Sequence, residues 1–339
     1  MQINQKLFAS NTHQYLECTK RKKLSEKYSY SQIFYKKTNS PADIGTMYHA
    51  ALENLLTLEN VNKEKITEFI NSYCGDESKG IDKDFVKSIE GRNTIFYIYN
   101  LLNKIKSIKD FSSYKVFTEY EYLSNDLFYG KIDLLLRKDN HSILIDYKTG
   151  KKIFDKTGSF KEDIQIQLMI YQIMEIEEVL HSNINSYIYN KNAESFELKY
   201  DKSKTDFLKN QIFKLNSRYS KNEFLTGSPE VCQNCKLSLN CDSYNELKLI
   251  DLNELNVIHG TVSNIKKEYN NHILTLTSND SILKNKTAKI TIRNSDNLNT
   301  IDNLQLNQEI KLQNIRYLSH DTDQIRFIFN NYGSIFIKN

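Results

Sequence analysis

Residues 130–150 read GKIDLLLRKDNHSILIDYKTG, and this stretch predicts the centre of the fold. Two apolar runs flank a polar break at Asp139 and Asn140, two residue types that tolerate turn conformations. If these two residues form the turn of a β-hairpin, counting back along both strands places Asp133 opposite Asp146. Residues opposed in this way have Cβ atoms about 4.5–5.5 Å apart on one face of the sheet. The hairpin therefore predicts two neighbouring carboxylates.

The predicted pair of carboxylates indicates a metal site. Two such groups repel each other unless they share a proton or hold a cation between them. Oxygen ligands of this kind suit Mg²⁺ or Mn²⁺. Lys148 lies two residues beyond Asp146 and points to the same face, where it can orient a water or offset charge on a phosphate. Metal-assisted phosphodiester hydrolysis needs this arrangement. The alternative is a solvated aspartate pair, but charged residues inside such apolar runs are costly unless paired or functional.

The sequence around the hairpin divides into three zones. Apolar residues recur at helical spacing up to about residue 109, and strand-like runs surround one amphipathic helix between about 116 and 200. Helices before and after a small sheet predict an α/β nuclease-like core. The third zone, 252–339, contains five strand-like runs separated by turn residues, which predict a small all-β barrel with an OB-fold as first candidate. These runs are Val257–Ile265, His272–Thr277, Thr287–Ile292, Glu309–Tyr317 and Gln324–Phe329. A structural or docking barrel and a strand-binding barrel fit equally well.

Three short motifs give the chain a family resemblance. Asp133 together with Asp146-Tyr147-Lys148-Thr149-Gly150 resembles the PD-(D/E)xK nuclease core, a central mixed sheet flanked by helices. More narrowly, the stretch resembles RecB-like exonucleases, whose metal-binding strand often reads Asp-Tyr-Lys-x-Gly. Upstream, residues 45–49 (GTMYH) match the Gly-x-x-x-His motif of that family, and downstream, residues 167–171 (QLMIY) match its Gln-x-x-x-Tyr motif. The resemblance covers about residues 8–245.

The resemblance implies a role for each matched residue. The metal ligands would be His49, Asp133, Asp146 and the backbone carbonyl of Tyr147. Lys148 would position the nucleophilic water, and Gln167 and Tyr171 would contact the DNA backbone or support the site. Many relatives carry Glu where this chain has Asp146, and both types occur. Glu119 or Glu121 could add a further carboxylate, and the sequence does not choose between them.

Five cysteines occur, and three of them are clustered as C-x₂-C-x₅-C at Cys232, Cys235 and Cys241. A four-coordinate site needs a fourth ligand, for which Cys18 and Cys74 are the candidates. Thiolates in this number select Zn²⁺ or an iron–sulfur cluster, and spacing alone does not decide between them.

The resemblance implies the iron–sulfur alternative. A subset of RecB-like nucleases, including CRISPR-associated exonucleases and the nuclease module of the AddB helicase–nuclease subunit, binds [4Fe–4S] with one upstream cysteine and this downstream spacing. Cys18 fits the upstream position, and the cluster would have a structural role. Lys20 and Arg21, which follow it, would contact phosphates or form a solvated basic helix end.

Length and composition narrow the function further. The 339 residues suggest two domains, a nuclease domain at 1–248 and a barrel at 249–339. No apolar run is long enough to span a membrane and no secretory signal is visible, so we expect a cytoplasmic protein. The net charge of +4 fits a nucleic-acid partner without requiring one. No P-loop is present, so any helicase must be a partner.

The sequence therefore predicts a metal-dependent exonuclease acting on single-stranded DNA or DNA ends in repair, recombination or defence. Two alternatives remain open. One is a non-catalytic nucleic-acid-binding subunit of a larger complex. The other is an endonuclease or an RNase that uses the same site.

Overall fold

The computed structural model describes most of the chain. The described residues are 6–28, 30–34, 39–122, 127–150, 153–180, 183–228, 231–232, 235–245, 257–269, 271–278, 286–293, 301, 304–320 and 323–338. The chain divides into two compact units, the first formed by Met1–Leu16 with Thr38–Ser217 and the second by Glu17–Lys37 with Arg218–Asn339. The predicted domain boundary at 248 lies outside the described residues and stays a prediction.

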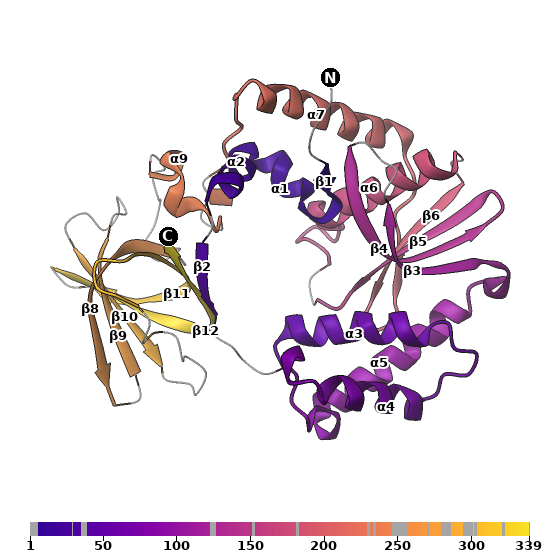
Figure 1. Ribbon diagram of the computed structural model, residues 1–339, viewed down its shortest axis with the longest axis horizontal. Helices are drawn as coiled ribbons and strands as arrows, with labels where there is room; N and C mark the ends of the chain where they lie inside the picture. Colours follow the sequence, from indigo (N-terminus) through magenta and orange to yellow (C-terminus); the bar gives the residue numbers. More distant parts are fainter. Residues whose placement is uncertain are drawn as a thin grey trace. The chain divides into compact units, whose positions relative to one another are not determined.

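The first unit contains a six-stranded mixed sheet with helices against it (Figure 1). Its strands pair in the order β1-β4-β5-β6-β7, and β3 also pairs with β4. The pairs β1–β4 and β5–β6 are parallel, and the pairs β3–β4, β4–β5 and β6–β7 are antiparallel. The strands are β1 (Leu7–Phe8), β3 (Lys115–Tyr122), β4 (Phe128–Lys138), β5 (His141–Lys148), β6 (Ile184–Asn190) and β7 (Ser195–Glu197). The predicted α/β core with a mixed sheet is confirmed.

The hairpin formed by β4 and β5 has the predicted register. Its pairing runs from Lys138 opposite His141 to Leu134 opposite Ile145, which makes Asp133 and Asp146 the next positions along the two strands. The turn residue Asp139 has φ 45°, a left-handed conformation that Asp adopts more readily than most side chains.

One face of this hairpin packs against three helices that begin the unit. These are α3 (Pro41–Leu55), α4 (Lys63–Cys74) and α5 (Ile89–Lys106). Alternate hairpin residues, among them Leu134 and Ile145, are fully buried in the same apolar core as these helices. A capping box between Ser40 and Asp43, followed by Pro41, begins α3 at a defined residue. Because α3 is fixed at this end and packed along its length, the position of His49 on it is also fixed.

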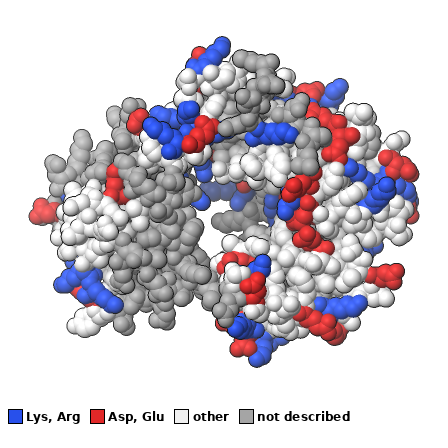
Figure 2. All heavy atoms as spheres, viewed as in Figure 1, with Lys and Arg blue, Asp and Glu red and all other residues white. Residues whose placement is uncertain are grey.

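Two further helices belong to this part of the chain, α6 (Glu162–Val179) and α7 (Lys202–Ser220). The α6 helix contacts β4, β5 and β6, so it faces the side of the hairpin that carries the acidic residues. Over the elements of this unit, Figure 2 shows Lys and Arg interspersed with Asp and Glu.

The second unit contains a curled β-sheet, which we call the barrel. The strands are β8 (Val257–Glu268), β9 (Asn271–Ser278), β10 (Thr287–Arg293), β11 (Glu309–His320) and β12 (Gln324–Lys338). They pair around a circuit, β8-β9-β10-β12-β11 and back to β8, in which only the β10–β12 pair is parallel. Each of the five predicted strands is confirmed, and their inward residues form a separate apolar core. A short strand, β2 (Tyr30–Phe34), adds to β12.

The described part of the second unit also contains α2 (Thr19–Lys27), the 3-10 helix η5 (Ser238–Asn240) and α9 (Asp242–Asn245). Across the described part of the chain, none of the helices has the length and apolar character to cross a membrane.

Candidate active site

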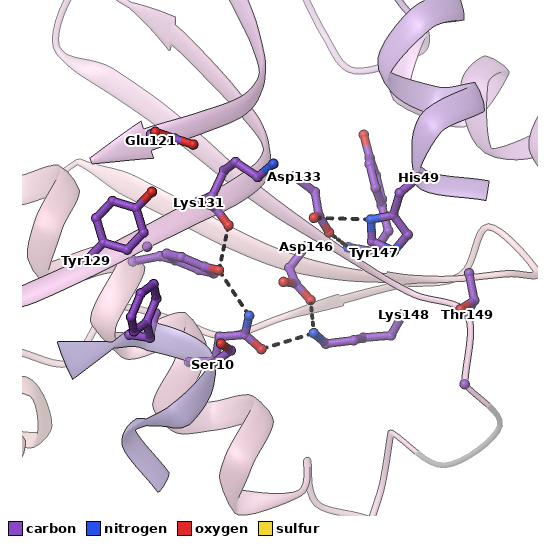
Figure 3. Close-up of a pocket in the computed structure, with 16 residues that line it drawn as sticks. Ser10, His49, Glu121, Tyr129, Lys131, Asp133, Asp146, Tyr147, Lys148 and Thr149 are labelled. Carbon is purple, nitrogen blue, oxygen red and sulfur yellow. Dashed lines mark hydrogen bonds and ion pairs between the residues drawn. The ribbon is translucent and has the colours of Figure 1, made fainter. Parts of the chain in front are cut away.

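A cavity of about 490 Å³ lies in the first unit, beside the ends of β4 and β5 (Figure 3). The residues given a role by the resemblance line it, namely His49, Asp133, Asp146, Tyr147, Lys148, Gln167 and Tyr171, and so does Glu121. The residues given a role come from α3, from both strands of the hairpin and from α6. The fold therefore brings three separate sequence motifs into one site.

The carboxylate of Asp133 contacts both the helix α3 and the strand β5. Its Oδ1 lies 3.2 Å from Nδ1 of His49, and its Oδ2 accepts a hydrogen bond of 2.6 Å from the backbone N–H of Tyr147. Burial lowers the pKa of His49, but the hydrogen bond and the charge of Asp133 outweigh it, so the pKa lies above its usual value. His49 is therefore held firmly against the acid.

Glu119 completes a candidate group of metal ligands. One ligand atom each from His49, Glu119 and Asp133 lies within 4.8 Å of the other two. This imidazole and these two carboxylates fit a divalent cation in donor type and in spacing. The sequence left Glu119 and Glu121 as alternatives, and the structure places Glu119 in the group.

The register of β3 with β4 explains why Glu119 belongs to the group, because the pairs on either side of it leave Glu119 across from Asp133. The φ of 51° at Glu119 is uncommon for a residue with a side chain, and the pairing of β3 with β4 is interrupted at this residue, between Thr118 and Tyr120. Its carboxylate also pairs with the ammonium of Lys131 at 2.6 Å. Strained conformations of this kind cluster at functional sites.

A second part of the site is a connected series of polar groups. The carboxylate of Asp146, almost completely buried, pairs with the ammonium of Lys148 at 2.7 Å. Lys148 donates to Oε1 of Gln167 at 3.0 Å, and Gln167 donates to the hydroxyl of Tyr171 at 3.0 Å. That hydroxyl donates to the backbone carbonyl of Lys131 at 2.8 Å, so the series returns to β4.

Burial determines the electrostatics of Asp146. Removal from water raises its pKa to about 6, the charge of Asp133 acts in the same direction, and Lys148 opposes both. Asp146 is not part of the compact group that contains His49. It lies in the same cavity, where its partner is Lys148.

Two glycines allow the close packing of this site. A Cβ on Gly45, the glycine of the Gly-x-x-x-His motif, would lie 3.1 Å from the hydroxyl oxygen of Thr149. A Cβ on Gly130 would lie 2.9 Å from the ring of Tyr171 and 3.1 Å from the Cβ of Ala9. Each glycine therefore permits one element to approach another that carries a motif residue.

Sequence reasoning missed two aromatic residues at this cavity, Phe8 and Tyr129. Phe8 belongs to β1, a strand of two residues that is too short to show any periodicity. No signal in the sequence could have placed it in the same cavity as Asp146.

The four predicted cysteine ligands gather in the second unit. Cys18, Cys232, Cys235 and Cys241 line one small cavity, together with Arg21. Burial raises the pKa of Cys232 to about 11, and the neighbouring thiols of Cys18, Cys241 and Cys235 add to this. Cys74 belongs instead to the apolar core around α4.

The thiols of this cysteine site are a donor set for a soft metal centre. In the described part of the chain, no three of their sulfurs lie within 4.8 Å of one another. Lys20 donates to the hydroxyl of Ser243 at 2.8 Å, so its ammonium contributes to local structure.

Comparison with known proteins identifies the family. The model of the PD-(D/E)XK nuclease superfamily matches residues 7–242. The chain belongs to this superfamily. Membership implies a metal-dependent nuclease with a DNA substrate, and members of the superfamily use divalent metals. No curated protein matches the chain.

Several solved structures are similar to the chain at low identity. The SSO0001 protein is 16% identical with a TM-score of 0.27, over 69% of this chain and 97% of that one. A protein from Eubacterium rectale with the provisional name of an exonuclease is 12% identical with a TM-score of 0.27, over 64% and 90%. A murine DNA-binding protein bound to double-stranded DNA is 8% identical with a TM-score of 0.21, over 66% and 95%. TM-scores this low establish no shared fold, so the family assignment depends on the family model.

Proposed function

We propose that this protein is a divalent-metal-dependent DNA exonuclease that hydrolyses phosphodiester bonds of single-stranded DNA or at DNA ends. One observation carries the proposal, the convergence of His49, Asp133, Asp146 and Lys148 in one cavity. An inactive copy would have no chemical need for this complete set, which argues against a purely binding subunit.

Each residue of the site has a separate role in this proposal. His49, Asp133 and Asp146 hold Mg²⁺ or Mn²⁺, with the carbonyl of Tyr147 as a further ligand and Glu119 next to them. When bound, the cation polarises the phosphate and lowers the pKa of a coordinated water.

Lys148 positions the attacking water and stabilises charge on the phosphate. Its ammonium is held between the carboxylate of Asp146 and the amide of Gln167, so little reorganisation is needed. Tyr171 fixes Gln167 in turn. Contacts of Gln167 and Tyr171 with the DNA backbone are compatible with this supporting role, since both line the cavity.

The activity is tested with end-labelled single-stranded DNA and Mg²⁺ or Mn²⁺. The parent protein is expected to degrade the substrate, whereas Asp146→Ala and Lys148→Ala are expected to be inactive. Lys138→Met is the matched control, because Lys138 lies on the same hairpin and does not line the cavity. Equal cutting by the parent and both variants would show that the site assignment is wrong.

The same assay separates the alternative activities. A closed circular single strand has no ends, so an exonuclease leaves it intact and an endonuclease cuts it. An RNA strand of the same sequence tests the RNase alternative. Binding without cleavage in any metal would favour the non-catalytic alternative. Since the sequence contains no nucleotide-hydrolysis motif, we propose that unwinding in repair or defence depends on a partner helicase.

For the cysteine site we propose a structural [4Fe–4S] cluster, with Zn²⁺ as the alternative. The four thiols line one cavity, and Cys74 lies elsewhere. Four thiolates are the number and type of ligands that either group needs, and the choice of the cluster follows from the family resemblance. Brown, iron-containing protein after anaerobic purification is expected, and colourless protein with one zinc would contradict the cluster.

For the barrel we propose an OB-like fold. The support is the strand circuit, which a parallel pair completes. This pair joins β10 and β12, the third and fifth strands of the barrel.

Lys20 and Arg21 are proposed to contact DNA phosphates near the cysteine site. Reversal of their charge is then expected to weaken DNA binding.

A further inference from the structure

An aromatic pair is exposed at the edge of the candidate active site. Phe8 leaves 54% of its surface in contact with solvent. Its ring lies edge-to-face against the ring of Tyr129, with centroids 5.0 Å apart and planes 82° apart. Both residues line the cavity that contains Asp146 and Lys148. An exposed apolar surface inside a cavity lined by charged groups needs an explanation.

The fold holds this pair in a defined place. Phe8 and Tyr129 are directly paired in the parallel ladder of β1 with β4. The backbone N–H of Leu7 donates to the carbonyl of Leu127 at 3.0 Å, which fixes the start of β1. Gly130 leaves room for Ala9 to pack closely behind the pair. The rings are therefore presented by regular backbone and not by a loop.

The pair also lies in line with the metal-binding residues. Tyr129, Lys131 and Asp133 alternate along β4 and therefore share one face of the strand. Four residues of strand span about 13 Å, a length that a few nucleotides cover. Figure 3 shows Tyr129 on the opposite side of the drawn site from His49, with Lys131, Asp133 and Asp146 between them. The ring of Tyr129, the half-exposed ammonium of Lys131 and the carboxylate of Asp133 thus follow one another along β4 toward the candidate metal site.

We propose that Phe8 and Tyr129 form a stacking subsite for an unpaired nucleobase of the DNA strand whose phosphate lies at Asp133 and Asp146. The inference depends on the proposed nuclease function and deepens it by assigning a subsite that binds one base of the substrate strand. Every base offers a flat π-face, so stacking on aromatic rings tolerates any sequence. The faces of a paired base are covered by its neighbours in a duplex. The subsite therefore selects single-stranded or frayed ends.

The experiment uses the full chain without divalent metal, in EDTA, so that binding is measured without cleavage. The probe is a short single strand that carries 2-aminopurine near one end, whose fluorescence falls when the base stacks. The parent is expected to bind and quench it. Phe8→Ala is expected to lose the quenching and to bind about tenfold more weakly, from the usual loss per stacked base. Phe8→Tyr is expected to restore both.

Phe207→Ala is the matched control, because Phe207 is 62% exposed on α7 of the same unit and does not line the cavity. Thermal melting checks that each variant is folded, and Tyr129→Ala gives a second test if Phe8→Ala is not. Absence of quenching in the parent, or equal quenching in the parent and a folded Phe8→Ala variant, overturns the inference.

Cleavage assays with Mn²⁺ distinguish a failure of the stacking subsite from a failure of the proposed nuclease function. Phe8→Ala is expected to raise KM for single-stranded DNA about tenfold while kcat is retained, and to change cutting of blunt duplex less. A parent that quenches the probe and cuts nothing would contradict the proposed function alone. A parent that cuts single strands while Phe8→Ala keeps the same KM would contradict the stacking subsite alone.

Discussion

The ammonium of Lys311 donates a hydrogen bond of 2.9 Å to the hydroxyl of Ser238, three residues after Cys235 of the cysteine site. It also donates to the backbone carbonyl of Cys235. Lys311 is completely buried on β11 of the barrel. The barrel therefore supports the turn that presents the cysteines, within one compact unit. The cysteine site and the barrel are expected to lose structure together.

Replacement of Lys311 tests this support. Lys311→Met keeps the apolar length of the side chain but removes the donor to Cys235 and Ser238. We expect the unfolding free energy to fall by about 1–3 kcal/mol, because two buried acceptors lose a partner. Urea denaturation of the full chain measures the unfolding free energy, and Lys267→Met on the exposed part of β8 is the control. An unchanged or raised stability would mean that the cost of burying the ammonium exceeds the value of its hydrogen bonds.

The buried imidazole of His259 predicts a dependence of stability on pH. Burial, and then the positive charge of Lys311, hold the pKa of His259 well below its usual value, so it is neutral in the folded protein. The unfolded chain binds a proton at His259 below pH about 6.5, and the folded chain does not. Stability from this residue is therefore complete above that pH and falls on acidification, by up to about 1.4 kcal/mol per pH unit.

Urea denaturation between pH 5 and pH 7.5 measures the effect. The parent is expected to lose more stability over this range than His259→Gln, which has no titrating group at this position. Carboxylates affect both proteins equally, so the difference between the two slopes isolates the imidazole. Parallel slopes would contradict the prediction.

The strained backbone at Glu119 predicts opposite effects on stability and on metal binding. Glu119→Gly relieves the φ of 51° and is expected to raise the unfolding free energy by about 1 kcal/mol. It also removes a carboxylate beside His49 and Asp133, so affinity for Mn²⁺ is expected to fall several-fold. Calorimetric titration with Mn²⁺ and thermal melting measure the two effects. Glu119→Ala lacks the carboxylate but keeps the strain, so it should be less stable than Glu119→Gly. Equal stability of the two variants would show that the strain is negligible.

The tight packing at Gly130 predicts that a single methyl group disturbs the site. In Gly130→Ala the new Cβ lies within 3 Å of Met174 and of the ring of Tyr171. The ring must move, which weakens the hydrogen bonds of its hydroxyl. We expect stability to fall by about 1–3 kcal/mol, together with lower nuclease activity. Gly150→Ala is the stability control, because no atom lies within 4 Å of its new Cβ. A Gly130→Ala protein as stable as that control would contradict the packing argument.

Much of the fold could be predicted from the sequence, because the relevant interactions are local. A two-residue turn and the two-residue period of strands fix the hairpin register, which the structure confirms as far as Leu134 and Ile145. The five strands of the barrel follow from their alternating runs in the same way. His49 could be predicted as a site residue only from the family motif. Its contact with Asp133 depends on how α3 packs against the sheet, which no local pattern shows.

Sequence by itself determined which residues share a strand face, because side-chain direction along a strand is set by covalent geometry. Only the tertiary structure decided which groups from distant segments meet. It grouped Glu119 with His49 and Asp133 through the register of β3 with β4, and it placed Phe8 beside Tyr129 through a strand of two residues. It also placed the buried ammonium of Lys311 under the cysteine turn. These contacts arise from the packing of whole elements, which no local pattern of residues specifies.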